Sequence, residues 1–157
     1  MSHLSGPLVV ENGIRNGTDQ ASESIYKDVV KSVRKQFTEA QVNDSGGTPV
    51  VEGIPGHKHR LVNATLVAVG GNAAGATHVE LASKQSTSTV KLVRVAVAGL
   101  AENDVTNMFA ASNVTLLNAG ASFASNNEGE PISITRVTNN LITATHIDVI
   151  LDYVVEE

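Results

Sequence analysis

The sequence predicts an all-β protein, an antiparallel sandwich or barrel that follows an N-terminal arm. Short apolar or alternating runs recur at intervals of about 8–12 residues, which is typical of such folds. Clusters of Gly, Asn, Asp and Pro separate these runs and supply turns. The chain of 157 residues has three Phe, two Tyr and no Trp. We therefore expect one domain whose core consists of Val, Leu, Ile and Ala.

Residues 1–33 form the predicted arm, because their one apolar run, Leu8–Val10, is surrounded by small and polar residues. From Ser22 to Gln41 the apolar residues lie near helical spacing, and a serine is available as an N-cap. Several of these residues are β-branched, however, and alternation extends through Val33 and Phe37, which favours a strand. The arm is therefore expected to be extended or partly helical, with both alternatives open.

The body is predicted to span residues 34–157, and its strands follow in order between turn signals. The predicted strands are Arg60–Val69, Thr77–Ala82, Thr87–Val97, Val114–Leu117, Pro131–Val137 and Thr143–Val155. Residues 99–113 match no pattern well and are expected to be a loop with a turn or a short strand. The glycine-rich stretch after Val69 resembles a dinucleotide-binding turn, but Asn72 stands where that motif requires glycine, and a strand follows. This pattern favours a hairpin loop.

The last predicted strand has two unlike faces. Successive side chains of a strand point to opposite sides. One face carries only apolar and aromatic residues and is predicted to be core: Ile147, Val149, Leu151, Tyr153 and Val155. The other face mixes polar and apolar residues: His146, Asp148, Ile150, Asp152 and Val154. We expect this second face to lie on the outside of the sheet, against solvent or a neighbouring protomer.

Charge is unevenly distributed along the chain. The formal net charge is −5, whereas proteins that bind nucleic acid need a basic surface, so no nucleic-acid partner is expected. Basic residues gather just before and within the start of the body, and carboxylates gather at the carboxyl end. These regions are predicted to form a docking surface for another protein or for a neighbouring copy of the chain. The candidate contact residues are Lys27, Lys31, Arg34, Lys35, His146, Asp148 and Asp152.

No catalytic, metal-binding or cofactor-binding residues are predicted. His57 and His59 would point the same way on a strand, but a zinc site needs three or four ligands and no companion motif is present. His146 and Asp148 share a strand face, yet the sequence has no Gly-x-Ser-x-Gly motif to supply a nucleophile. Acid–base pairs such as Asp148 with Asp152 are better explained as solvated charges. The protein is therefore expected not to be an enzyme.

The composition also bears on where the protein is made. Cysteine is absent, which excludes disulfides and agrees with assembly in a reducing cytoplasm. No uninterrupted apolar stretch approaches the about 18 residues of a membrane-spanning helix, and the first residues lack the pattern of a signal peptide. We expect a protein that is made in the cytoplasm and has no membrane partner.

Several stretches of the body resemble a group of small tailed-bacteriophage virion proteins that decorate or cement the capsid shell. The stretches are Lys35–Val42, Ile54–Val62, Leu66–Gly71, Val90–Val93 and Thr145–Val155, and the resemblance covers about residues 34–157. It implies an antiparallel jelly-roll sandwich, commonly a homotrimer on the outer capsid surface, without an active site. The implied partners are the major capsid protein and further copies of this chain, and the implied location is the virion.

The resemblance therefore predicts a structural virion protein that binds the outer surface of a phage capsid and stabilises it. Several weak contacts presented together would gain strength through effective concentration. The alternative is a tail-fibre or carbohydrate-recognition β-sandwich that attaches the particle to a host. The few aromatic residues leave little surface on which sugar rings could stack, which favours the capsid-binding function.

Overall fold

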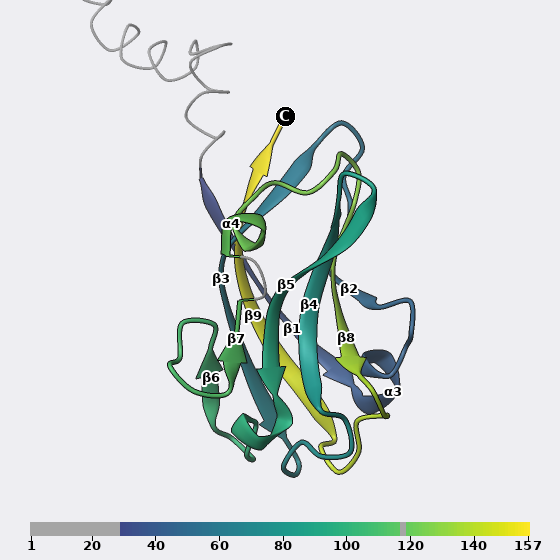
Figure 1. Ribbon diagram of the computed structural model, residues 1–157, viewed down its shortest axis with the longest axis vertical. Helices are drawn as coiled ribbons and strands as arrows, with labels where there is room; N and C mark the ends of the chain where they lie inside the picture. Colours follow the sequence, from purple (N-terminus) through teal and green to yellow (C-terminus); the bar gives the residue numbers. More distant parts are fainter. Residues whose placement is uncertain (1–28, 117–118) are drawn as a thin grey trace, which may run out of the picture.

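The computed structural model describes residues 29–116 and 119–157, and these residues form a sandwich of two antiparallel sheets (Figure 1). The four-stranded sheet contains, in spatial order, β1 (Val30–Thr38), β9 (His146–Glu156), β3 (Lys58–Val69) and β6 (Val105–Asn107). The five-stranded sheet contains β2 (Thr48–Val51), β8 (Ile132–Val137), β4 (His78–Gln85), β5 (Ser88–Ala96) and β7 (Val114–Thr115). Three single turns of helix join strands: α3 (Glu39–Val42), η1 (Val97–Gly99) and α4 (Ala119–Ser122).

The strand order is that of a jelly roll with one added strand. Apart from the two-residue β7, the order β1-β9-β3-β6 faces the order β2-β8-β4-β5. The chain passes from one sheet to the other at most of its connections, and the hairpin between β4 and β5 stays within one sheet. Two facing four-stranded sheets linked in this way form the double Greek key of a jelly roll. The predicted fold class is confirmed.

The segment whose conformation the sequence left open contains a strand followed by a short helix. β1 begins at Val30 and pairs with β9 along its whole length, with Val30 opposite Val154 and Thr38 opposite His146. Thr38 then caps α3 through a capping box with Gln41. The four-stranded sheet therefore includes Val30–Val33, which the sequence had assigned to the arm before the predicted boundary at residue 34. Residues 22–28 lie outside the described part of the chain.

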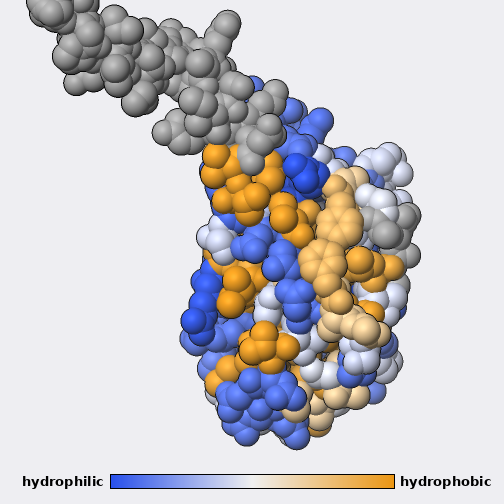
Figure 2. All heavy atoms as spheres, turned by 90° about the vertical axis from the view of Figure 1, so that its left-hand side faces the viewer, coloured by the Kyte–Doolittle hydropathy of each residue, from blue (hydrophilic) through white to orange (hydrophobic). Residues whose placement is uncertain are grey.

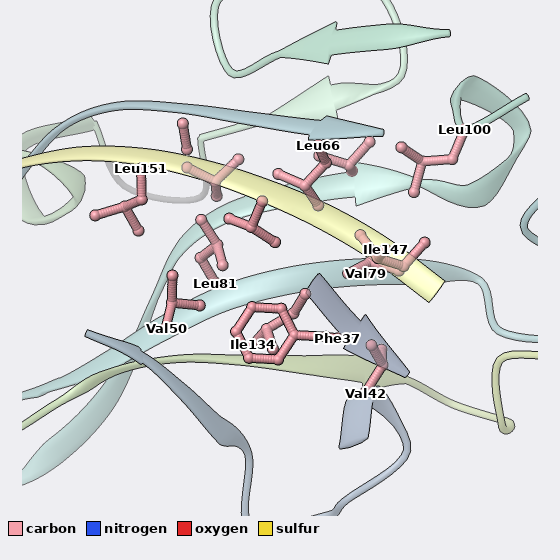
Figure 3. Packing of buried hydrophobic residues seen from close by; sticks show 14 of the residues in the cluster. Phe37, Val42, Val50, Leu66, Val79, Leu81, Leu100, Ile134, Ile147 and Leu151 are labelled. Atoms are coloured by element: carbon pink, nitrogen blue, oxygen red, sulfur yellow. The ribbon is translucent and has the colours of Figure 1, made fainter. Parts of the chain in front are cut away.

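The core lies between the two sheets and consists mainly of aliphatic side chains, as expected. Figure 3 shows labelled members that point into the space between the sheets, among them Phe37 from β1, Leu66 from β3, Ile134 from β8 and Leu151 from β9. Each of these four side chains is at most 2% exposed. A jelly roll built this way buries its aliphatic residues on alternate strand positions.

β9 follows the predicted alternation except near its end. Ile147, Val149 and Leu151 are fully buried in the core. Val154 was predicted to lie on the outer face and is nevertheless only 2% exposed, whereas Val155 is half-buried. Val154 stands between Val30 of β1 and Arg60 of β3, and Arg60 reaches the Glu156 carboxylate on the same face.

Two short segments differ from the predicted strands, and a third agrees with the expectation. β2 was not predicted, because Pro49 and the two glycines before it resemble a loop. β6 is a short strand within residues 99–113, in agreement with the expectation for that stretch. The predicted strand Val114–Leu117 is observed only as Val114–Thr115, and residue 117 lies outside the described residues.

The glycine-rich stretch after Val69 is not a hairpin loop, which corrects the prediction. It joins β3 in one sheet to β4 in the other. Gly70 and Gly71 have positive φ angles, and a Cβ atom on Gly70 would lie 2.1 Å from the Thr145 hydroxyl. The glycines are therefore required because this crossover packs closely against the segment that enters β9.

Candidate interaction surface

The outer face of the four-stranded sheet brings together three of the predicted contact residues. One guanidinium nitrogen of Arg34 lies 2.9 Å from Oδ2 of Asp148, and Nε2 of His146 lies 3.2 Å from Oδ1. Asp148 is buried although it faces outward, because Arg34 and His146 lie against it, whereas the Arg34 side chain is 69% exposed. The three residues form a polar cluster near the end of this face at which β1 and β3 finish, and we call it the Asp148 cluster.

The Asp148 cluster consists of polar side chains that a partner could contact, and none of its three residues is a serine or threonine. The hydrogen bond from Arg34 satisfies Oδ2, while Oδ1 accepts no well-aligned hydrogen bond from the described residues and lies 3.2 Å from Nε2 of His146. No serine or threonine of the described residues donates a hydrogen bond to His146. Asp148 thus orients Arg34 and His146, and both side chains remain partly accessible to another molecule.

The remaining predicted contact residues do not join this cluster. Asp152 lies on the same face, opposite Ser32 of β1, and no cation of the described residues lies within ion-pair distance of it. Lys31 and Lys35 alternate with Arg34 and therefore point to the other side of β1, at the open edge of the sandwich. Lys27 lies outside the described part of the chain. Arg34 therefore lies on one side of β1, and Lys31 and Lys35 lie on the other.

Exposed hydrophobic residues are concentrated on and beside the same outer face. In the described part of the chain, seven large hydrophobic residues are exposed, and four of them belong here: Val30 at 53%, Val105 at 72%, Phe109 at 62% and Ile150 at 38%. Figure 2 shows hydrophobic patches on this side of the molecule, separated by hydrophilic atoms. Mixed apolar and charged surfaces of this kind are usual at protein–protein interfaces.

Phe109 is held in place at the edge of this face, next to β6. Its backbone N–H donates to the Asn107 side chain, whose amide donates to Asn63 and Thr65 on the outer face of β3. The ring of Phe109 stacks on Phe123 with a centroid separation of 6.0 Å. An exposed aromatic ring that is fixed in this way loses little conformational entropy on binding a partner.

A buried polar cluster closes one end of the sandwich. His59 is 1% exposed, and its Nε2 has no hydrogen-bond partner in the part of the chain that the structure describes. Asn126 joins the His59 backbone to the hydroxyl of Ser83 and to the Glu130 carbonyl. Burial lowers the pKa of His59, because the charged imidazolium loses its hydration, and this effect outweighs the hydrogen bond to the Glu130 carbonyl. No sequence pattern predicts this structural role for His59.

The two histidines that the sequence placed near each other have different environments. Nδ1 of His57 lies 3.1 Å from the Pro55 carbonyl oxygen and outside the core, whereas His59 packs edge-on against Tyr153. Among the residues that the structure describes, no group of three or more His, Cys, Asp or Glu side chains could hold a metal ion.

The outer face of the five-stranded sheet carries a shallow cavity of about 300 Å³. The lining is polar and contains no aromatic side chain; it includes Ser45, Gly47, Lys84, Lys91 and Glu130. Beneath it, the carboxylate of Glu80 is 3% exposed and is paired with Lys91 and Arg94 at 2.6 and 2.9 Å. These ion pairs are satisfied within the protein and explain why a carboxylate is buried there.

The comparisons with known proteins leave the chain without an assigned family. No protein-family profile matches the sequence, and no curated protein sequence matches it. Within residues 29–116 and 119–157, no helix is long and apolar enough to cross a membrane.

Proposed function

We propose that this chain is a non-enzymatic structural protein of a phage virion that binds the outer surface of the capsid and stabilises it. The observation that carries the proposal is the resemblance of residues 34–157 to capsid decoration proteins, which predicts the jelly roll that the strands form. The proposed partners are the major capsid protein and further copies of this chain in a homotrimer.

The outer face of the four-stranded sheet is the proposed contact surface. It presents the Asp148 cluster together with exposed Ile150 and Val105, and Phe109 stands at its edge. Hydrophobic contacts would supply most of the binding free energy, and the charged groups would favour one orientation of the partner. The N-terminal arm, with the basic residues before and in β1, is proposed as a second contact.

Attachment to shells tests the proposal directly. The full-length protein would be mixed with empty shells of the phage that encodes it, from which this protein has been removed, and bound protein measured after sedimentation. We expect saturable binding and shells that withstand a higher temperature. The variant Phe109→Ala is expected to bind less tightly, whereas Lys84→Ala on the other sheet serves as a control. Absence of binding by the wild-type protein would refute the proposal.

The oligomeric state is tested separately by size-exclusion chromatography with light scattering. A homotrimer would have three times the mass of the chain. A monomer that still binds shells would refute the trimer and leave the attachment function in place.

A further inference from the structure

The longest open strand edge described in this protein belongs to β1. β1 pairs with β9 on one side through nine residues, and the described residues place no strand on its other side. The edge strands β2, β6 and β7 have four, three and two residues. Proteins usually shorten or cover open edges, because unpaired N–H and C=O groups attract other strands. An open edge of nine residues therefore needs an explanation.

The charges of β1 are all of one sign. The strand contains Lys31, Arg34 and Lys35 and no carboxylate. Arg34 is paired with Asp148, whereas Lys31 and Lys35 have no carboxylate within ion-pair distance in the part of the chain that is described. Both lysines lie on the same side of β1, with Val33 between them.

These charges oppose pairing between two copies of β1. In an antiparallel pair of β1 strands that overlap along their full length, Arg34 of each copy would stand opposite Arg34 of the other. The lysines of the two copies would take diagonal positions. Like charges at opposite positions destabilise a strand pair, so a second copy of β1 is not the partner that this edge favours.

We propose that the open edge of β1 binds an extended, carboxylate-rich segment of another protein by strand addition. The main-chain groups of β1 would bind the added strand, as in other cases of β-augmentation. Carboxylates at alternate positions of the added strand would share one face and meet Lys31 and Lys35. The proposed function names the capsid protein as a partner. The present inference goes beyond it, because it states which kind of segment would bind the edge of β1.

Hydrogen exchange on the full-length protein tests the inference without shells. The probe is a peptide with the sequence Thr-Val-Glu-Val-Asp-Val-Glu-Val-Thr, and the control peptide has lysine at the three acidic positions. We expect saturating acidic peptide to slow exchange of the β1 amides at least about fivefold, since added ladder hydrogen bonds protect outward-facing N–H groups. The basic peptide should leave exchange unchanged.

A pair of matched variants separates the β1 edge from general charge. The double variant Lys31→Glu with Lys35→Glu should bind the acidic peptide about tenfold more weakly or worse, because two attractive contacts become repulsive. The double variant Lys58→Glu with Lys84→Glu changes the net charge equally at other sites and should bind like the wild type. Circular dichroism would verify that both variants fold.

Several results would overturn the inference. The acidic peptide could leave hydrogen exchange of the β1 amides unchanged, or both peptides could protect these amides equally. The variant Lys31→Glu with Lys35→Glu could also bind the acidic peptide as tightly as the wild type does. Protection of β1 in concentrated protein without peptide would also overturn it, because a second copy would then fill the edge. None of these experiments uses capsid shells, so a negative result would not bear on the proposed binding to the capsid. That proposal is tested separately by the shell-binding experiment.

Discussion

Replacing Phe37 with alanine should destabilise the fold strongly, because β1 contributes this ring to the core. Phe37 is 2% exposed and stands opposite Ile147 of β9. Truncation of a buried Phe removes its transfer free energy and leaves a cavity, which together cost about 3–5 kcal/mol. For a domain of this size, each kcal/mol corresponds to about 2–4 °C in Tm. We therefore expect Tm to fall by about 6–20 °C in thermal unfolding followed by circular dichroism.

The same substitution at Phe109 is the matched control. Phe109 is 62% exposed and contacts Phe123 at the surface. Because little of the ring is buried, the loss of burial and stacking should cost at most about 1.5 kcal/mol. Urea unfolding of both variants would give the two free energies of unfolding. Equal losses, or a loss below about 1.5 kcal/mol for Phe37→Ala, would show that β1 is not part of the core.

Three further predictions concern pH, the Asp148 cluster and a close backbone contact. Because the pKa of His59 is lowered from 6.5 in the folded state, the unfolded chain takes up a proton first as the pH falls, and stability should decrease from about pH 6.5 downward. Urea unfolding at several pH values would give the free energies of unfolding of the wild type and of His59→Gln. If the difference between these two free energies did not change with pH, the prediction would be contradicted. Arg34→Met should cost only about 1 kcal/mol, because the arginine is largely exposed, and adding Asp148→Asn should recover most of the loss. A larger loss in the double variant would contradict this. Gly53→Ala should cost about 1–3 kcal/mol, because the new Cβ would lie 1.9 Å from the Gly129 carbonyl oxygen, and unchanged Tm would show that the two loops can separate.

Local sequence pattern predicted the fold class and most strands of this protein. Alternation identified Ile147, Val149 and Leu151 as core residues, since the pleat of a strand fixes which side chains share a face. It was less successful where neighbouring strands changed the environment. Val154 is buried where it stands between Val30 of β1 and Arg60 of β3, and no pattern within β9 contains that information.

The two-residue periodicity also separates the cations of β1, but their surroundings depend on the sheet order. Arg34 meets Asp148, which lies 114 positions away in the sequence, only because β9 is the neighbour of β1. Lys31 and Lys35 lie at an open edge because no described strand follows β1 in that sheet. The sequence placed all three in one candidate contact region, whereas the structure divides them between two surfaces.

The sequence by itself therefore determined the β-architecture, the aliphatic core and the position of the charged residues along the chain. The tertiary structure decided that Asp148 is buried on an outward face, that His59 is buried with a lowered pKa and that β1 ends a sheet. The physical reason is that side-chain direction within a strand depends on adjacent residues alone. Burial and charge pairing depend on which distant strands become neighbours when the sandwich closes.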